Sequence, residues 1–504
     1  MFNSQLATRY SLLGAALMAS AAFAQTASKP KKGDWTMWGG SPDRNMVSDE
    51  TGMPTKWDIK TGENILWSAP LGSQSYGNAV VSGGKVFVGT NNGGEFRPKA
   101  KGDKGILLCF DEKSGKLLWQ ATHDKLPTGQ VNDWPEQGIC STVAVEGDRV
   151  YYVSNRCELV CVDVEGLKPG KNTGPVTDEK YNEEGDADIV WSLDMMDQLA
   201  VFPHNLATSS PVIVGDLIYI HTSNGVDEGH LNLPSPDAPA FIAVNKKTGE
   251  LVWHRSDPGK QTLHGQWSAP SYAVIGGTPQ VIFAGGDGWC YAFDPLKGGE
   301  PFWKYDLNPK DSKYVLGGRG VRCYIIATPV IHSERVFLAV GQDPEHGEGV
   351  GNFHCIDATK RGDITESGKV WAVSGKSFNR TLSTAAVKDG LVYNCDLSGF
   401  VYCFDEKTGK QHWRYDTEAA LWGSCYVVDG KVYIGDEDGY LHILKEGKEL
   451  KEIAKIDMGG SVYTTPVASN GVLYVNNRRM LFAIKEGARS TPIADKKKEP
   501  AAGQ

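Results

Sequence analysis

The segment VYCFDEKTGKQHW, at residues 401–413, carries the pattern that decides the fold. Alternating apolar residues predict a strand, Asp405 opens a turn, Gly409 supplies the positive φ that the turn requires, and Trp413 stands near the start of a second strand. Copies of this hairpin end at Trp119, Trp253 and Trp303, and looser copies end at Trp191 and Trp371. A hairpin that recurs in this way along the chain predicts a repeat architecture.

A second type of hairpin precedes each of these units, as in GSCYVVDGKVYIGD at residues 423–436. Its two short strands flank an Asp-Gly turn, and Gly-Asp or Asn-Gly takes this place in other copies, which is a strong hairpin signal. Two hairpins make one four-stranded blade. The first hairpins begin near Ala79, Val143, Pro211, Pro270, Pro329, Ala385, Cys425 and Pro466. The sequence therefore predicts an all-β, eight-bladed β-propeller, or seven blades if the seventh copy, which lacks the tryptophan, is wrongly divided.

The two ends of the repeat region complement each other. The last copy ends with AIKEG at residues 483–487 and has no fourth strand. In contrast, NILWSAPLG at residues 64–72 is a fourth-strand sequence with no blade before it. We therefore predict that this N-terminal strand completes the last blade, because such closure removes the exposed sheet edges of an open array.

The composition suits such a ring. The 504 residues exceed the size at which a single core usually stops growing, roughly 250 to 300 residues, but a repeat architecture escapes that limit. A net charge of −9 without a basic stripe argues against nucleic acid as a partner. We expect a signal peptide at residues 1–24, a propeller at residues 25–487 and a disordered tail at residues 488–504, and we expect a monomer.

The first residues have the features of a secretory signal peptide. Arg9 precedes an apolar stretch at residues 11–21, and Ala22-Phe23-Ala24 provides a small-residue cleavage site. No later segment reaches the roughly 18 to 20 apolar residues that a membrane helix needs. The sequence therefore predicts an exported protein, periplasmic or secreted, that is cleaved after Ala24 and has no transmembrane segment.

The ten cysteines fall into two groups. Four of them share a repeat position that is Ala in other copies, which predicts small buried core residues. These four are Cys109, Cys161, Cys355 and Cys403, and the alanines are Ala243, Ala292 and Ala483. Of the others, Cys140 and Cys157 are the one pair that we predict to form a disulfide.

In its fullest form the repeat reads A-x-D-x-x-T-G-K-x-x-W, and this pattern resembles the repeat of the pyrroloquinoline-quinone (PQQ) family. The resemblance extends over nearly all of residues 35–487. The sequence is similar to two branches of that family, the quinoprotein dehydrogenases and the BamB-like propellers that scaffold outer-membrane protein assembly. The family's tryptophans wedge between neighbouring blades, which implies structural docking roles for Trp67, Trp119, Trp191, Trp253, Trp303, Trp371 and Trp413.

Long polar loops are predicted on one face of the ring, in blades three to five. They join second strands to third strands, or one blade to the next, so the propeller topology places them on the same face, where function is commonly carried. The candidate ligand-face residues in these loops are His204, Asp227, Glu228, His230, His264, Asp287, Trp289, Arg319, Arg322, Asp343, Glu345, His346 and Glu348. On the other face the turns are tight, apart from an acidic run at residues 165–189 that we interpret as a solvated insertion.

Two kinds of site are compatible with these residues. His230 and His346 each stand among carboxylates and are predicted to face each other, which suits Zn²⁺, another divalent ion or Ca²⁺. Arg319 and Arg322 suit a carboxylate or phosphate. The alternative is that the loops brace one another through ion pairs, and since no spacing matches a known metal motif, metal ligands and catalytic residues stay unassigned. Four aromatic residues stand close to the same face, Tyr76, Trp267, Trp422 and Tyr463. Their position suits either the lining of the channel mouth or ordinary packing at the start of a strand.

We favour a non-enzymatic binding or scaffold protein of the cell envelope, BamB-like in fold, with a protein or small-molecule ligand on its loop face. The repeat, the signal peptide and the lack of a recognisable catalytic constellation support this hypothesis. The BamB-like branch is typically lipid-anchored, whereas this chain has no cysteine at the cleavage site.

The alternative is a quinoprotein oxidoreductase that uses PQQ with Ca²⁺. Enzymes of that branch usually stack the quinone on a disulfide between adjacent cysteines and use an Asp base beside the calcium ligands, but no two cysteines are adjacent here. If PQQ binds, the resemblance implies Asp343 or Asp287 as the base and Trp289 as the stacking partner. A hydrolase or carbohydrate-binding role for paired carboxylates is a third hypothesis.

Overall fold

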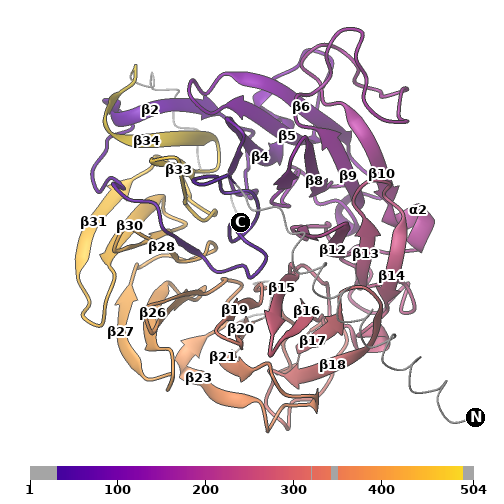
Figure 1. Cartoon of the computed structure of the whole chain (residues 1–504), viewed down its shortest axis with the longest axis vertical. Coiled ribbons are helices and arrows are strands. Elements are labelled where there is room, and N and C mark those ends of the chain that lie inside the picture. The colour runs from indigo at the N-terminus through magenta and orange to yellow at the C-terminus, as the bar shows by residue number, and fades with distance from the viewer. Residues whose placement is uncertain (1–30, 319, 342–349, 492–504) are drawn as a thin grey trace, which may run out of the picture.

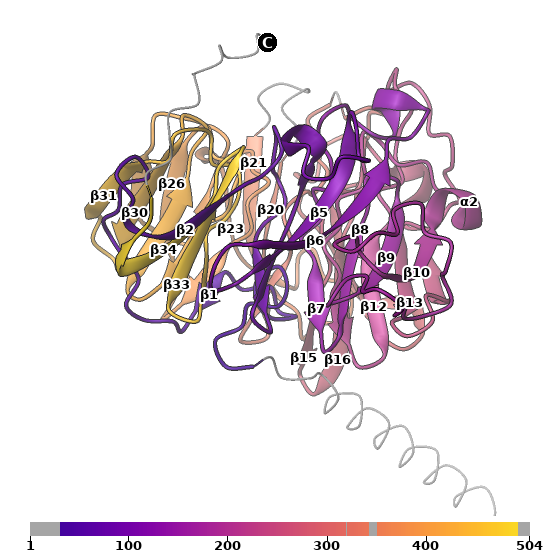
Figure 2. The ribbon, with the colours of Figure 1, turned by 90° about the horizontal axis from the view of Figure 1, so that it is seen from above.

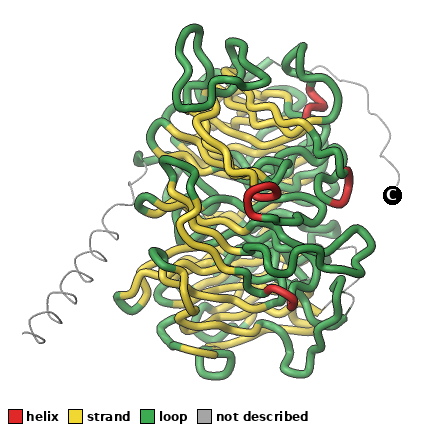
Figure 3. Tube along the Cα trace, turned by 90° about the vertical axis from the view of Figure 1, so that its right-hand side faces the viewer, coloured by secondary structure: helices red, strands yellow, loops and turns green. Residues whose placement is uncertain are grey.

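The computed structural model describes residues 31–318, 320–341 and 350–491. The described strands form eight sheets around a common axis, each built on four antiparallel strands (Figure 1). Seen from its edge, the ring has strands running between two loop-covered faces (Figure 2), and helices make up very little of it (Figure 3). The prediction of an eight-bladed propeller is confirmed, and the seven-blade alternative is wrong.

The strands of the first four blades are β3 (Val80–Ser82), β4 (Lys85–Asn91), β5 (Lys104–Asp111) and β6 (Leu117–Asp124); β7 (Ala144–Glu146), β8 (Arg149–Val153), β9 (Glu158–Asp163) and β10 (Ile189–Asp194); β11 (Val212–Val214), β12 (Leu217–His221), β13 (Phe241–Asn245) and β14 (Leu251–Arg255); β15 (Ser271–Ile275), β16 (Thr278–Ala284), β17 (Trp289–Asp294) and β18 (Gly298–Asp306). A short strand, β22 (Gly362–Asp363), joins the outer edge of blade 4.

The strands of the last four blades are β19 (Val330–His332), β20 (Arg335–Val340), β21 (Val350–Asp357) and β23 (Lys369–Asn379); β24 (Ala386–Lys388), β25 (Leu391–Cys395), β26 (Phe400–Asp405) and β27 (Gln411–Asp416); β28 (Tyr426–Val428), β29 (Lys431–Gly435), β30 (Tyr440–Lys445) and β31 (Glu452–Asp457); β32 (Val467–Ser469), β33 (Val472–Asn476), β34 (Met480–Arg489) and β2 (Glu63–Pro70). The strand β1 (Val47–Ser48) pairs with β28. The described chain also contains the helix α2 (Met195–Leu199) and 3₁₀ turns at Asn92–Gly94, Gly129–Val131 and Gly259–Gln261.

The N-terminal strand closes the ring as predicted. The strand β2 pairs antiparallel with β34, with Trp67 opposite Ala483. Figure 1 shows the indigo β2 lying beside the yellow β34, so the two ends of the repeat region share one blade. Among the described residues, no helix has the length and apolarity needed to cross a membrane.

Each docking tryptophan lies against the blade that follows its own. The indole Nε1 donates to a backbone carbonyl of the next blade in six pairs: Trp67 to Glu112 (2.9 Å), Trp119 to Val164 (3.0 Å), Trp191 to Lys246 (3.1 Å), Trp253 to Pro295 (2.8 Å), Trp371 to Glu406 (2.9 Å) and Trp413 to Gly447 (2.9 Å). Trp303 differs, because it is fully buried under β22 and donates to Gln280 of its own blade (2.8 Å).

The turn glycine of the repeat receives the tryptophan of the preceding blade. A Cβ added to Gly409, where φ is 68°, would lie 2.7 Å from the ring of Trp371. The same close approach joins Gly115 to Trp67, Gly166 to Trp119, Gly249 to Trp191 and Gly298 to Trp253. Two constraints therefore require glycine at this turn position. The backbone has a positive φ, and the indole that covers the residue leaves no space for a Cβ.

The residue paired with each docking tryptophan is small. Across the outer strand pair, Cys109, Cys161, Cys355 and Cys403 face Trp119, Trp191, Trp371 and Trp413, and Ala243, Ala292 and Ala483 face Trp253, Trp303 and Trp67. In blade 7 Ala454 replaces the tryptophan, and its partner is the larger Ile443. The four cysteines are thus buried core residues, as predicted.

Cys140 and Cys157 are not joined in the structure. The ten cysteines, which all lie within the described residues, are free thiols. The Sγ of Cys140 is 3.8 Å from the Gln137 carbonyl, whereas the Sγ of Cys157 contacts the Thr222 carbonyl of blade 3 at 3.4 Å. The prediction of a Cys140–Cys157 disulfide is therefore wrong, because the two thiols contact different parts of the chain.

The N-terminal segment at residues 33–50 closes one end of the axis. The backbone N–H of the innermost strand donates to this segment in several blades: Val81 to Trp35 O, Val145 to Thr36 O, Tyr272 to Pro42 O, Ile331 to Asp43 O, Val387 to Asn45 Oδ1 and Val427 to Met46 O. Figure 1 shows this indigo segment crossing the middle of the ring. The inner edge of each blade is buried, so its polar groups require such partners.

Polar side chains also join neighbouring blades around the axis. The bonds are Thr142 N to Ser210 Oγ, Thr328 N to Thr384 Oγ1, Thr384 N to Ser424 Oγ, Ser424 N to Thr465 Oγ1, Thr465 N to Asn78 Oδ1 and Asn78 Nδ2 to Thr142 Oγ1. Blade 4 has Ala269 at this position, and the buried Arg44 bridges blades 3 and 4 there through the carbonyls of Ser210 (3.0 Å) and Pro270 (2.8 Å). Burial lowers the pKa of Arg44 to about 9, against the opposing effect of Asp43.

The substitution Gly409→Ala should destabilise the ring far more than Gly430→Ala. Both glycines have a positive φ (68° and 70°), but a Cβ at Gly430 meets no atom within 4 Å. We expect a loss of about 1 kcal/mol in the free energy of unfolding at Gly430 and of about 3 kcal/mol or more at Gly409, where the Trp371 contact is also lost. Denaturant unfolding of the two variants measures this difference, and equal losses would contradict the docking role of the glycine.

Candidate functional site

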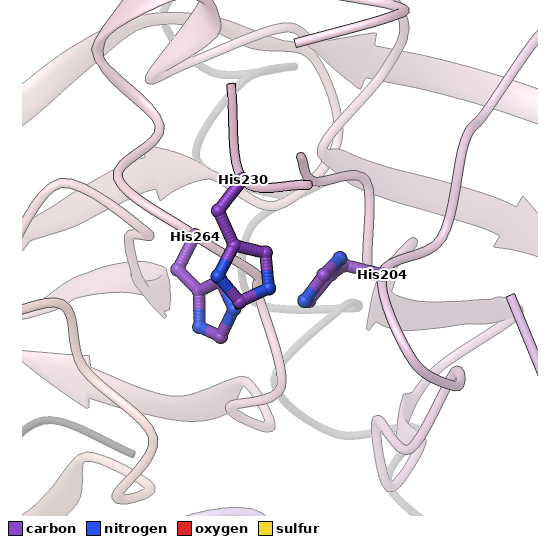
Figure 4. A group of neighbouring side chains, drawn as sticks. All are labelled: His204, His230 and His264. Carbon is purple, nitrogen blue, oxygen red and sulfur yellow. The ribbon is translucent and has the colours of Figure 1, made fainter. Parts of the chain in front are cut away.

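Three of the predicted ligand-face residues meet in one cluster. His204 lies in the loop between β10 and β11, His230 in the loop between β12 and β13, and His264 in the loop between β14 and β15. One ring nitrogen from each can be chosen so that all three lie within 4.8 Å of one another. Figure 4 shows the three rings gathered around a common point, and the Nε2 atoms of His230 and His264 are 3.3 Å apart.

Backbone and side-chain contacts hold the rings of the histidine cluster. The Nδ1 of His204 is 2.8 Å from the carbonyl oxygen of Val226, and since a carbonyl only accepts, Nδ1 carries the proton and Nε2 the lone pair. The Nδ1 of His264 is 3.0 Å from the hydroxyl of Tyr324. His204 and His264 are buried, and His230 is half-buried.

Two further residues let the loops approach closely. A Cβ at Gly225 would lie 2.5 Å from the carbonyl oxygen of His264 and 2.7 Å from the Cβ of His204, so only glycine fits between them. The indole Nε1 of Trp267 donates to the carbonyls of His204 and Leu206, both at 3.1 Å. The Trp267 ring lies 5.2 Å from the His264 ring and 6.0 Å from the His204 ring.

Of the two acidic candidates near His230, Asp227 holds the loop between β12 and β13 in shape. Asp227 accepts from the backbone N–H groups of Leu231 (2.8 Å) and Asn232 (3.1 Å), and these bonds and the Asn232 side chain keep the pKa of Asp227 below its usual value. His230 has a φ of 55°, which the turn imposes. Glu228 is exposed.

Asp287 closes the turn between β16 and β17. Its carboxylate accepts from the backbone N–H of Trp289 (3.1 Å) and from the hydroxyl of Tyr291 (2.6 Å), and its burial raises its pKa to about 7. In blades 6 and 7 an aspartate two positions earlier in the turn makes the equivalent contact with the residue that corresponds to Tyr291: Asp396 with Tyr402 (2.6 Å) and Asp436 with His442 (2.9 Å). This recurrence assigns Asp287 to the architecture of the blade.

Of the remaining candidates, Arg322 and Trp289 lie in the described part of the chain. Arg322 makes two 3.0 Å bonds to the Asp306 carboxylate and a 2.9 Å bond to the carbonyl oxygen of Asp287. Trp289 packs under the ammonium group of Lys304, 4.7 Å from its ring centre. Arg319, Asp343, Glu345, His346 and Glu348 lie outside the described residues, and so does the predicted approach of His346 to His230.

A ring of equivalent residues surrounds the axis next to the histidine cluster. One residue per blade, two positions before the residue of the polar ring described above (Ala269 in blade 4), is half-exposed: Tyr76, Cys140, Thr208, Trp267, Ile326, Leu382, Trp422 and Tyr463. We call these eight the axial ring. Tyr76 stacks on Tyr463 at 5.2 Å, and Trp422 meets Tyr463 edge-on at 5.9 Å. Trp267 belongs to the axial ring and packs on His204 and His264, so the cluster lies beside the axial ring, at the end of the axis away from residues 33–50.

The acidic insertion is not merely solvated. Lys180 and Tyr181 bond the carboxylate of Asp124 in blade 1, and Asp186 pairs with Gln120. The insertion thereby helps to line a cavity of about 250 Å³ between blades 1 and 2, together with His123 and Glu158. Most of residues 165–189 are exposed, as expected of a solvated insertion, while Lys180 and Tyr181 attach it to the neighbouring blade.

Comparison with known proteins shows the same two branches. The family model described as outer membrane protein assembly factor BamB matches residues 103–172, 361–450 and 401–489. The 1-butanol dehydrogenase (quinone) of Thauera butanivorans is 30% identical over 504 aligned positions that cover 82% of this chain and 74% of that protein. The chain belongs to the PQQ-repeat β-propeller family.

Other members of the PQQ-repeat β-propeller family are more distant in sequence. The outer membrane protein assembly factor BamB of Moranella endobia is 24% identical over 374 positions, covering 71% of this chain and 77% of that protein. Two solved structures share the fold: BamB from Moraxella catarrhalis (TM-score 0.53, 14% identity, 85% of this chain and 99% of that one) and quinohemoprotein alcohol dehydrogenase from Comamonas testosteroni (0.62, 13%, 97% and 86%). The chain is thus similar both to BamB and to quinoprotein dehydrogenases.

Asp287 should make stability depend on pH between about 4 and 7. Its pKa is about 7 in the folded protein and ordinarily about 4, so the folded state binds the extra proton in this range. The stability that this proton contributes is present below pH 4 and is lost as the pH rises to 7. Relative to Asp287→Asn, the wild type should lose up to about 4 kcal/mol of unfolding free energy over this range. Urea unfolding at several pH values measures the difference, and a constant difference would contradict the buried, protonated carboxyl.

Proposed function

We propose that this chain is an exported, non-enzymatic binding propeller of the cell envelope whose ligand face is the axial ring and the loops around it. The observation that most supports this proposal is the difference between the two ends of the propeller axis. Residues 33–50 close one end, and half-exposed, largely apolar side chains surround the other. Aromatic residues are enriched at protein-binding surfaces, and blades 7, 8 and 1 contribute three adjacent ones, Trp422, Tyr463 and Tyr76.

Exposed apolar residues on the neighbouring loops support a protein ligand. Leu231 is 72% exposed and Val321 is 75% exposed, and both lie within predicted ligand-face loops, at residues 223–239 and 316–324, that contribute to or contact the histidine cluster. Apolar side chains gathered on one face are typical of an interaction surface. Since one relative is named an outer membrane protein assembly factor, we infer that the ligand is an extended polypeptide with alternating apolar residues, as in the strands of outer-membrane proteins.

Three of the described charged candidates, Asp227, Asp287 and Arg322, are engaged in the scaffold, which favours binding over catalysis by these residues. A general base needs a carboxylate or imidazole that reaches the substrate, whereas Asp287 and Asp227 are held in turns and Arg322 is paired with Asp306. These bonds stabilise the scaffold.

A quinoprotein dehydrogenase is the second candidate, favoured by the 30% identity to 1-butanol dehydrogenase (quinone). That activity implies a quinone with Ca²⁺, which takes oxygen ligands. Among the residues that the structure describes, the group able to share an ion consists of three imidazoles, and the carboxyl of Asp287 closes a turn. These residues do not fit a calcium–quinone centre.

Calorimetric titration of the chelator-treated protein with PQQ, with and without Ca²⁺, separates the two candidates. We expect no saturable heat in either titration, because the described donor set is nitrogen-based. Calcium-dependent saturation would place the dehydrogenase first and overturn the proposal of a non-enzymatic protein.

The double variant Trp422→Ala/Tyr463→Ala should bind a synthetic peptide with alternating aromatic residues about 10-fold more weakly than the wild type, since two aromatic contacts are lost. The matched control is Tyr440→Ala, which removes an exposed aromatic side chain from the outer part of blade 7. Fluorescence anisotropy of the labelled peptide measures the affinities. Equal affinity in the double variant and the control would exclude the axial ring as the binding surface.

A further inference from the structure

We propose that His204, His230 and His264 form a binding site for a divalent transition-metal ion with nitrogen ligands, such as Zn²⁺. The three residues come from three separate loops, yet one ring nitrogen from each lies within 4.8 Å of the others. Neutral imidazole is the commonest side-chain ligand for such ions. This site does not depend on the proposed polypeptide ligand.

The spacing of the nitrogens suits a shared ion. At a tetrahedral zinc with Zn–N bonds of about 2.0 to 2.1 Å, two ligand nitrogens are about 3.3 to 3.4 Å apart. The Nε2 atoms of His230 and His264 are 3.3 Å apart. The His204 ring is 4.3 Å from the His264 ring and 4.9 Å from the His230 ring, centre to centre, and one of its nitrogens lies within 4.8 Å of a nitrogen of each.

The contacts behind the rings are those that metal-binding histidines use. A ligating imidazole usually donates its second N–H to a carbonyl or another acceptor, which fixes the tautomer and the ring orientation. His204 donates from Nδ1 to the Val226 carbonyl (2.8 Å), and the Nδ1 of His264 meets the Tyr324 hydroxyl (3.0 Å). Both rings therefore direct Nε2 toward the centre of the cluster (Figure 4).

The site combines two buried rings on fixed loops with one half-buried ring. His204 and His264 are buried, and Trp267 and Gly225 fix their loops, whereas His230 is half-buried on a turn held by Asp227. An ion would thus join the turn of His230 to two rigid loops. Within the described residues the site supplies three ligands, which a fourth donor, such as water or a group of a bound molecule, would complete at a tetrahedral ion.

Calorimetric titration of the full-length, chelator-treated protein with ZnCl₂ tests the site. We expect saturation near one ion per chain and a rise of several degrees in the melting temperature, since the ion binds only the folded state. The decisive variant is His230→Asn, because Asn tolerates the φ of 55° and the site is half-exposed there. It should weaken zinc binding by about 100-fold and abolish the zinc-dependent stabilisation.

His254→Asn is the matched control, since His254 is exposed on β14 of the same blade. It should bind zinc like the wild type. A second readout is the visible spectrum of the Co²⁺-loaded protein, in which a four-coordinate site absorbs strongly. No saturable zinc binding, or undiminished binding by folded His230→Asn, would overturn the site. Neither result affects the metal-free peptide titration, so failure of this site and failure of the proposed function are distinguishable.

Discussion

The contact between a tryptophan and the turn glycine of the next blade is the interaction on which the ring depends. A single four-stranded blade cannot bury its own outer tryptophan, because the indole projects toward its neighbour. Gly409 must lack a Cβ for Trp371 to lie against it, and the indole N–H then finds the Glu406 carbonyl of the same turn. Every such contact spans two blades, so the repeat unit is stable only within a closed array.

The same constraint explains the sequence around the tryptophan. The paired residue is Cys or Ala wherever the tryptophan is present, and in blade 7, where Ala454 takes its place, the partner becomes Ile443. At that blade residues 53–57 supply bulk instead: Trp57 joins the buried cluster, and the Tyr433 hydroxyl donates to the Pro54 carbonyl (3.0 Å). Volume removed from one position is thus replaced from another part of the chain.

The repeated features could be predicted from the sequence, and the unrepeated ones could not. Blade number, closure by the N-terminal strand and the tryptophan positions follow from a pattern that recurs. The structural role of Asp287 has a weaker signal, because Asp396 and Asp436 stand two positions earlier in the corresponding turns. The path of residues 33–50 has no repeat to reveal it. Likewise, thirteen candidate residues follow from loop length, but loop conformation decides that His204, His230 and His264 meet and that Arg322 turns to Asp306.

Trp267 connects the architecture to the site. By its place in the repeat it is the blade-4 member of the axial ring, and by its indole N–H it fixes the loop that carries His204. Its ring also packs against His264, so both buried histidines rest on a side chain that faces the axis. An ion held by the cluster would therefore order the loops on either side of Trp267 and stiffen one wall of the axial ring. Binding at the axis and metal occupancy would then be coupled through this one side chain, because each fixes the same loops.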